Sequence, residues 1–343
     1  MYDSSKLRVI MESIRSFLFN LFIMAKVIYL GVKQFFQEAC RTVNPINDPL
    51  NRQGEYAIIT GGNRGIGFYT LLGLQASGMK VIAGCRDGRS KQQLFEKLEE
   101  AGIPADSVEW INLDLSSLNS VKIFAKVVID RNIRISLLIN NAAIMFTTYG
   151  LSKDGFEQQF AVNYLGHFLL THLLLPQLVE GGKHNRYASR IVNVSSDSSF
   201  LGYLNLDDLH AKSFYNKFVA YAQSKLAQVL FNEMLHTHLT QNDHPIKCYA
   251  IHPGVVRSNW YNTTWYLKIS VRITGFCNIK SETLAAQRVL YTSFSPVLEN
   301  SSGCYLSDCK ITTPASKLLC PTLRLKLWDV TLKILDIEQF GKL

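Results

Sequence analysis

TGGNRGIG, at residues 60–67, is the stretch that decides the fold of this chain. The apolar, β-branched residues 56–60 before it are typical of a buried strand. Residues 68–78 after it have helical spacing and end at Gly78, a suitable C-cap. Glycines between a strand and a helix permit a tight turn, a close approach by a ligand and outward N–H groups. The stretch therefore predicts a phosphate or pyrophosphate site, with a plain tight turn as the alternative.

Apolar strands alternate with helices along the rest of the chain. We expect strands at 79–87, 108–116, 135–145, 188–196 and 246–254. We expect helices at 90–102, 117–131, about 154–180 and 219–239. This alternation is typical of a parallel sheet covered on both faces, which binds ligands at the carboxyl ends of its strands. The predicted fold is α/β: a Rossmann-type, doubly wound parallel sheet in a single domain at 54–343.

Composition excludes several classes of function. The chain has 343 residues, of which 47% are hydrophobic, and a net charge of +9. The charge suits an anionic membrane surface or ligand. No nucleic-acid partner is expected, because the basic residues are scattered and no DNA- or RNA-binding motif occurs. The seven cysteines form no CxxC pair and no His/Cys spacing suits zinc, so no metal site is expected.

The first fifty residues differ from the rest. Residues 17–32, FLFNLFIMAKVIYLGV, are apolar except for Asn20 and Lys26, and this run is short and flawed for a membrane span. Polar side chains share one arc of a helix here, so a helix lying in the membrane interface fits at least as well. We predict a retained membrane anchor at 1–41, with a cleaved signal peptide as the alternative, and a linker at 42–53. The expected location is a membrane, of the endoplasmic reticulum or of a lipid droplet.

Five further motifs follow the glycine stretch. They are NNAA at 140–143, Asn163 within FAVNYLGHF, VSS at 194–196, YAQSK at 221–225 and HPG at 252–254. With TGGNRGIG, this ordered set resembles the short-chain dehydrogenase/reductase family over about residues 55–310. The surrounding sequence looks most like the membrane-associated branch with the retinol dehydrogenases, and within it the X-linked dehydrogenase/reductase group linked to polyprenol oxidation. Ala143 stands where the family usually has glycine, a small change that we expect to be tolerated.

Tyr221 and Lys225 are four residues apart on a predicted helix, so their side chains share one face. A free tyrosine has a pKa near 10, and a nearby ammonium favours the phenolate. The resemblance implies that Tyr221 moves a proton and that Lys225 also binds the nicotinamide ribose. It further implies that Ser196, rather than Ser195, holds the substrate oxygen, and that Asn163 holds a water linking Lys225 to solvent. A solvated helix face or a serine that merely ends a strand is the alternative for each residue alone.

Other polar residues of these motifs are expected to be structural. His167 and His252 lie in motif contexts where histidine is common, and we expect neither to be catalytic. Of the three N-x-S/T sequons, Asn193 should be buried in a strand, whereas Asn262 and Asn300 suit glycosylation only if the domain faces a lumen.

Cofactor contacts are also implied by the resemblance. The expected residues are Gly61, Asn63, Arg64, Gly65, Ile66, Gly67, Arg86, Asp114, Leu115, Asn141, Ala142, Tyr221, Lys225, Pro253, Gly254 and Ser258. Sites for NAD usually have an acid at the end of the second strand, where this chain has Cys85 followed by Arg86. Arg64 can face the same pocket, and two guanidinium groups suit a 2′-phosphate, which favours NADP(H). Asp87 keeps NAD(H) or dual use open, because it can pair with Arg86 or reach the ribose.

The implied reaction is hydride transfer between the nicotinamide and a lipophilic alcohol or its aldehyde or ketone. The expected lid, at about 259–280, combines aromatic residues with Lys268 and Arg272, and no acid occurs from 259 to 277. This favours a polyprenol, retinoid or steroid reached from a membrane, with 323–335 against the same surface. Aromatic residues that simply pack as lid core are the alternative, and a homodimer is possible. The alternative functions are a catalytically idle nucleotide-binding or scaffold protein, and an epimerase or lyase on the same fold.

Overall fold

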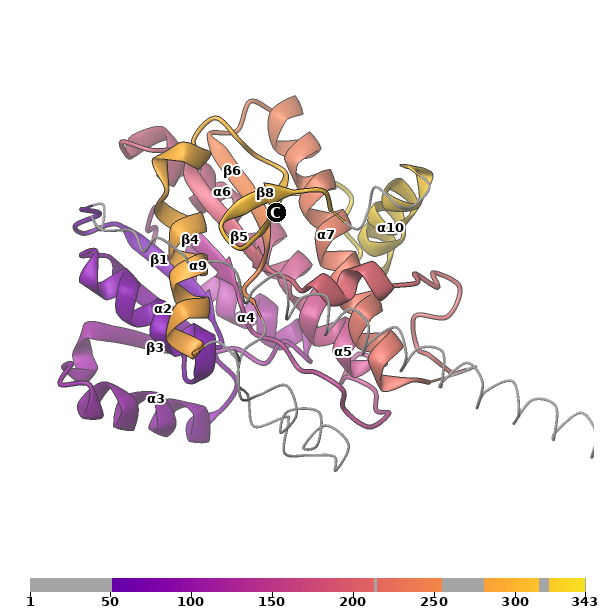
Figure 1. The fold of residues 1–343 in the computed structure, drawn as a ribbon, viewed down its shortest axis with the longest axis horizontal. Helices are drawn as coiled ribbons and strands as arrows, with labels where there is room; N and C mark the ends of the chain where they lie inside the picture. Colours follow the sequence, from indigo (N-terminus) through magenta and orange to yellow (C-terminus); the bar gives the residue numbers. More distant parts are fainter. Residues whose placement is uncertain (1–50, 213–214, 255–280, 315–320, 343) are drawn as a thin grey trace, which may run out of the picture.

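An eight-stranded sheet organises the chain in the computed structural model, which describes residues 51–212, 215–254, 281–314 and 321–342 (Figure 1). The strands are β1 (Tyr56–Thr60), β2 (Lys80–Cys85), β3 (Val108–Asn112), β4 (Ile135–Asn140), β5 (Ser189–Val194), β6 (Ile246–His252), β7 (Cys304–Ser307) and β8 (Lys310–Thr312). Their order is β3-β2-β1-β4-β5-β6-β7-β8, with β1 to β7 parallel and β8 antiparallel. The predicted doubly wound sheet is confirmed. Its strand order reverses between β1 and β4, the kind of switch point where open sheets bind ligands.

Helices cover both faces of this sheet. They are α2 (Gly65–Ala76), α3 (Gly88–Glu100), α4 (Leu118–Ile129), α5 (Gln158–Phe160), α6 (Gly166–His184), α7 (Lys217–Gln241), α9 (Glu282–Phe294) and α10 (Pro321–Ile334). Neighbouring residues of a strand point to opposite faces, so Ile58 packs in the core beneath α4, α6 and α7, and Ile59 beneath α2 and α9. Figure 1 shows α2 and α9 side by side on one face.

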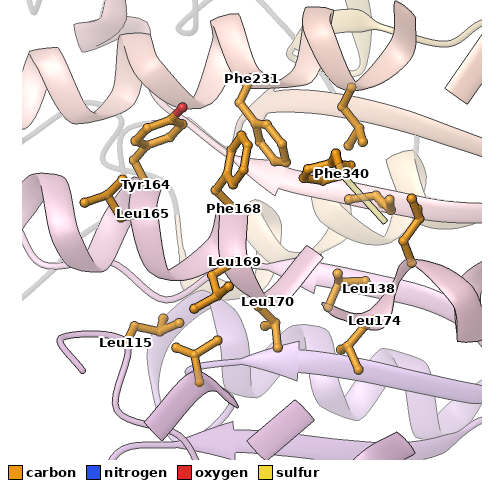
Figure 2. Close-up of a cluster of buried hydrophobic side chains, with 14 of the residues drawn as sticks. Leu115, Leu138, Tyr164, Leu165, Phe168, Leu169, Leu170, Leu174, Phe231 and Phe340 are labelled. Carbon is orange, nitrogen blue, oxygen red and sulfur yellow. The ribbon is translucent and has the colours of Figure 1, made fainter. Parts of the chain in front are cut away.

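The C-terminal helix α10 packs on α7 and closes one of the two cores. Leu327 is buried, and the Trp328 ring lies 5.2 Å from the ring of Phe168 and 4.9 Å from that of Phe340. Figure 2 shows Phe168, Phe231 and Phe340 gathered in this cluster. Part of the apolar pattern at 323–335 is therefore used in the core, although Leu325 remains half exposed.

The predicted strands extend too far at their carboxyl ends. β4 ends at Asn140 rather than at 145, because the Thr60 hydroxyl accepts the N–H groups of Asn141 and Ala142 and turns the chain out of the sheet. β3 and β5 likewise end before their predicted limits, at Asn112 and Val194. Polar and small residues therefore follow the strands at this edge, where the site residues lie.

The first described residues pack against the domain. The Arg52 side chain is 3% exposed, lies 3.3 Å from the Glu55 carboxylate and stacks on the Tyr187 ring. The Arg52 N–H donates to the Ser77 carbonyl at 2.9 Å. The end of the segment expected as a linker is thus part of the folded surface. The predicted anchor at 1–41 and the predicted lid at 259–280 lie outside the described residues, and no helix among the described residues is long and apolar enough to cross a membrane.

Candidate active site

The glycine stretch forms a turn between β1 and α2 in which several positions admit only glycine. Gly61 and Gly65 have φ of +69° and +58°, a region that favours glycine. A Cβ on Gly67 would lie 2.2 Å from the Gly61 carbonyl oxygen and 2.6 Å from the Asn141 side-chain nitrogen. The Arg64 side chain at the N-cap makes no capping bond within the described chain, so the first turn of α2 presents its N–H groups. These features fit the pyrophosphate of a dinucleotide.

Buried His167 links three parts of the site. Burial lowers its pKa to about 4, so its neutral ring has one donor and one acceptor nitrogen. Nδ1 lies 3.1 Å from the Asn163 carbonyl oxygen, which only accepts, so Nδ1 carries the proton. Nε2, 2.9 Å from Thr60 Oγ1, therefore accepts from the Thr60 hydroxyl. Since the Thr60 oxygen accepts from Asn141 and Ala142 at 3.0 and 2.9 Å, His167 ties the glycine turn to the NNAA loop and to Asn163.

Asn163 lies in a π-helical turn, Ala161–Leu165, between α5 and α6. Its side-chain oxygen accepts from the Ile144 N–H and its amide donates to the Ile144 carbonyl, both at 2.9 Å. The amide also donates to Ser224 Oγ on α7 at 2.9 Å. The helical stretch predicted at about 154–180 is present and runs to His184. It begins at Gln158 rather than at 154, because the segment before it forms a turn and a bridge, and it contains one π turn that the sequence did not predict.

Tyr221 and Lys225 lie one turn apart on α7, as their spacing predicts. The Tyr221 ring packs edge-on against Phe146, with the centroids 5.0 Å apart, and the Lys225 Nζ lies 5.7 Å from the Tyr221 ring centre. The same Nζ donates to the Val194 carbonyl and to Oε1 of Gln228, each at 2.9 Å. Burial lowers the pKa of Lys225 to about 7, so near neutral pH the amine lies close to its titration point. A buried group poised in this way is typical of catalytic sites.

The two serines after β5 have different surroundings. Ser195 is buried, and its hydroxyl donates to the Lys225 carbonyl at 2.9 Å. Ser196 is only partly buried, and its Oγ accepts from the Ser198 N–H at 3.2 Å at the start of a short 3₁₀ helix, Asp197–Leu201. Ser196 is thus the serine whose hydroxyl proton can reach a ligand.

The residues expected to distinguish NADP from NAD lie at the end of β2. Cys85 is buried, which raises its pKa to about 11. Asp87 caps α3: its Oδ1 accepts from the Ser90 N–H and hydroxyl, both at 2.8 Å, and these bonds lower its pKa. Arg86 touches Asp87 at 3.3 Å but is 68% exposed, and Arg64 is exposed too. Arg86 at the end of β2 and Arg64 at the N-cap of α2 are therefore both accessible to a ligand, while the Asp87 carboxylate caps α3.

The other expected cofactor residues are distributed along the carboxyl edge. Asp114 accepts from Ser116 and lies 3.0 Å from Lys153 Nζ, so it holds the loop after β3, and hydrogen bonding lowers its pKa against the effect of burial. Asn63 donates to Gln93 at 2.8 Å. Leu115 is buried, and Ile66 is partly buried over the α2 core. Pro253 and Gly254 follow β6, whereas Ser258 lies outside the described residues.

Tyr305, which belongs to none of these sequence motifs, also contributes to this edge. Tyr305 on β7 donates to Asp197 Oδ1 at 2.6 Å, and Asp197 lies 3.8 Å from His252 Nε2. Burial raises the pKa of Tyr305 well above its ordinary value, and the Asp197 carboxylate adds to the effect. Asn193 is buried and bonds to Asn140 and Asn232, as its strand position indicates, so its sequon is not accessible. No local pattern could have identified Tyr305, because its partner is distant in the sequence.

A hollow of about 620 Å³ lies on the outer face of α3, lined by residues such as Phe95, Ile103 and Pro104, away from Tyr221. No group of three or more His, Cys, Asp or Glu side chains in the described part of the chain is placed to hold a metal ion.

The fold and these residues define a class of oxidoreductase that uses a nicotinamide dinucleotide. The family model for short chain dehydrogenases matches residues 55–265. Human polyprenol dehydrogenase is 36% identical over 289 residues, covering 84% of this chain and 86% of that protein. Human retinol dehydrogenase 14 is 35% identical over 319 residues, covering 89% and 93%. The structure of NADPH-bound carbonyl reductase from chicken fatty liver matches with a TM-score of 0.58 and 25% identity, over 76% of this chain and all of that one. The chain therefore belongs to the short-chain dehydrogenase/reductase family and is an NAD(P)-dependent oxidoreductase.

Proposed function

We propose that this enzyme interconverts a lipophilic alcohol and its aldehyde or ketone, with NADP(H) as the preferred cofactor. The observation that carries the proposal is the placement of Tyr221 and Lys225 one turn apart on α7, which packs against the segment that follows Ser196. The bound nicotinamide would supply or accept the hydride. Tyr221 moves the hydroxyl proton, and Ser196 holds the substrate oxygen beside it.

Lys225 and Asn163 support the proton transfer. The Lys225 ammonium has three donors, and Val194 and Gln228 accept from two of them. The third is available to a cofactor ribose, and the positive charge favours the phenolate of Tyr221. The side chain of Asn163 holds the loop after β4. Its main-chain carbonyl oxygen, which lies 3.1 Å from His167 Nδ1, would also accept from a water that connects Lys225 to solvent.

The preference for NADP(H) rests on the end of β2. Asp87 is held as the cap of α3, so it does not reach for a ribose 2′-hydroxyl unless the cap opens. Arg86 and Arg64 are exposed and can fork onto a 2′-phosphate. The NADPH-bound chicken carbonyl reductase shows that the same fold accepts this cofactor.

A lipophilic substrate is supported by two relatives whose names specify polyprenol and retinol. Access from a membrane is also geometrically feasible. Arg52 is packed at the amino ends of the strands, and any nine-residue segment such as 42–50 can span about 30 Å at most. Strands of five to seven residues rise only about 17–23 Å. An anchor at 1–41, in the endoplasmic reticulum or a lipid droplet, could therefore lie beside the catalytic edge.

The proposal also bears on assembly. A homodimer across α7 would have to displace α10, whose Trp328 and Leu327 pack into the core there. We propose that any homodimer uses another face, and light scattering of the detergent-purified full chain would reveal the stoichiometry.

The experiment that tests the function is a substrate panel with the purified full chain. Prenals, retinal and fatty aldehydes of increasing length are supplied with NADPH or NADH, and the alcohols are identified by mass spectrometry. We expect turnover with NADPH and a kcat/KM that rises with chain length. Tight nucleotide binding with no turnover of any carbonyl would favour the idle scaffold. Preference for a small polar carbonyl would overturn the lipophilic assignment.

A further inference from the structure

Two buried arginines tether α9, one toward each edge of the sheet. Arg190 lies at the amino-end edge, where it contacts the carbonyls of Thr292 and Ser295 and the Glu299 carboxylate. Arg288, on α9 itself, lies toward the carboxyl-end edge and is 2% exposed. Neither residue belongs to a motif that the sequence analysis used, and the proposed function assigns no role to Arg288.

Arg288 joins two segments that follow neighbouring strands. Its guanidinium forms an ion pair with Asp308, and its Nη1 donates to the Pro253 carbonyl at 3.0 Å. Asp308 and Pro253 lie side by side because His252 pairs with Ser307 in the register of β6 and β7. The planar fork of arginine can contact a carboxylate and a carbonyl together, which the point charge of lysine does less well.

The Pro253 carbonyl lies next to the catalytic residues. His252, which precedes it, accepts from the Asp197 N–H at 3.4 Å, and Asp197 follows Ser196 directly. The proline ring fixes its own φ, and Gly254 then turns the chain with a φ of +97°. The hydrogen bond from Arg288 therefore fixes the peptide between Pro253 and Gly254.

We propose that Arg288 is a positioning residue, which through its bond to the Pro253 carbonyl fixes the loop after β6 and thereby the nicotinamide half of the bound cofactor. The inference rests on the proposed function, because hydride transfer beside Tyr221 and Ser196 requires the nicotinamide to lie against the carboxyl ends of β5 and β6. The adenine half would lie toward the ends of β2 and β3, so we expect its binding not to depend on Arg288.

The test compares whole cofactor with its adenine half by calorimetry on the purified full chain. The ligands are NADP⁺ and adenosine 2′,5′-bisphosphate or, if the wild type prefers the other cofactor, NAD⁺ and 5′-AMP. We expect Arg288→Met to weaken the whole cofactor about tenfold and the adenine half less than about twofold. The matched control is Arg190→Met, which removes an equally buried arginine at the opposite edge. Measured at a temperature below its melting point, this variant should bind both ligands within about twofold of the wild-type affinities.

Arg288→Lys distinguishes the ion pair with Asp308 from the hydrogen bond to the Pro253 carbonyl. Lysine keeps a cation against Asp308 but lacks the fork, so we expect near-wild-type melting together with weakened binding of the whole cofactor. Wild-type affinity in both Arg288 variants, or equal weakening in Arg190→Met, would overturn the inference. Failure of both Arg288 variants to fold would show that the ion pair of Arg288 with Asp308 serves stability alone, and this result would also overturn the inference. A wild type that binds neither dinucleotide instead refutes the proposed function itself.

Discussion

Two buried cations at opposite edges of the sheet, Arg190 and Lys225, have different surroundings. At the amino-end edge, Arg190 is paired with the Glu299 carboxylate at 2.7 Å and also contacts two carbonyls and the face of Tyr249. At the carboxyl-end edge, Lys225 is fully buried, and its acceptors among the described residues are the neutral groups of Val194 and Gln228. Its pKa falls to about 7, a direction that burial alone explains.

The difference indicates which of the two cations contributes mainly to stability and which is suited to chemistry. A charge paired with an opposite charge resists titration, whereas a charge held only by dipoles remains easy to titrate. Catalytic sites commonly keep such unfavourable groups at a cost in stability. Substitution of Arg190 and substitution of Lys225 should therefore have different consequences.

The largest expected effect comes from one hydroxyl at the catalytic edge. Tyr221→Phe removes the hydroxyl that we propose to move the proton but removes little volume, so we expect kcat to fall by about 100-fold or more, with cofactor affinity changed by only a few-fold. The control is Tyr249→Phe, whose buried hydroxyl donates to the Leu298 and Ser301 carbonyls at the opposite edge. It should cost stability and leave kcat nearly unchanged. Steady-state kinetics would contradict the assignment if Tyr221→Phe kept more than about a tenth of wild-type kcat.

Replacing each of the two buried cations with methionine should separate effects on stability from effects on activity. Arg190→Met leaves Glu299 and two carbonyls without their partner, so we expect the free energy of unfolding to fall by about 3–5 kcal/mol while kcat changes little. Lys225→Met removes a charge that burial already disfavours, so kcat should collapse while stability changes by less than about 1 kcal/mol. Urea denaturation and kinetics on both variants measure this. A similar loss of stability in the two variants would refute the proposed difference between Arg190 and Lys225.

Much of this arrangement follows from local sequence. The strand runs, the glycine turn and the four-residue spacing of Tyr221 and Lys225 are short-range patterns, and the strand order places them on one edge. The π turn around Asn163 was not predictable, because helical spacing carries no signal for one extra residue. The pair of Arg190 with Glu299 and the contact of Tyr305 with Asp197 join residues more than one hundred positions apart. Such contacts depend on the tertiary packing and leave no motif.

The neutral ring of His167 should make the catalytic edge sensitive to acid. Its pKa in the folded state is about 4, below its ordinary 6.5, so between these values the unfolded chain binds a proton that the native chain does not. The contribution of the neutral His167 ring to the free energy of unfolding is therefore complete above pH 6.5. It is lost as the pH falls toward 4, by about 3 kcal/mol. His172 shifts in the same direction, so the difference between wild type and His167→Gln isolates one residue. Chemical denaturation from pH 7 to pH 4 measures it, and a difference that stays constant with pH would contradict this account.

The smallest expected effect concerns the cofactor preference at the end of β2. Arg86→Ala should weaken NADPH by about 10- to 100-fold, since a lost charge-assisted contact is worth about 1.5–3 kcal/mol, and should change NADH much less. Arg64→Ala should act in the same direction. The matched control is Arg89→Ala, which removes a neighbouring exposed arginine from the first turn of α3. Asp87→Asn keeps the cap bonds to Ser90 and so tests whether the carboxylate contributes to NADH binding. Equal losses for both cofactors in Arg86→Ala would show that this arginine does not contact a 2′-phosphate. A selective loss of NADH affinity in Asp87→Asn would show that the acid reaches the ribose and that the enzyme uses both cofactors.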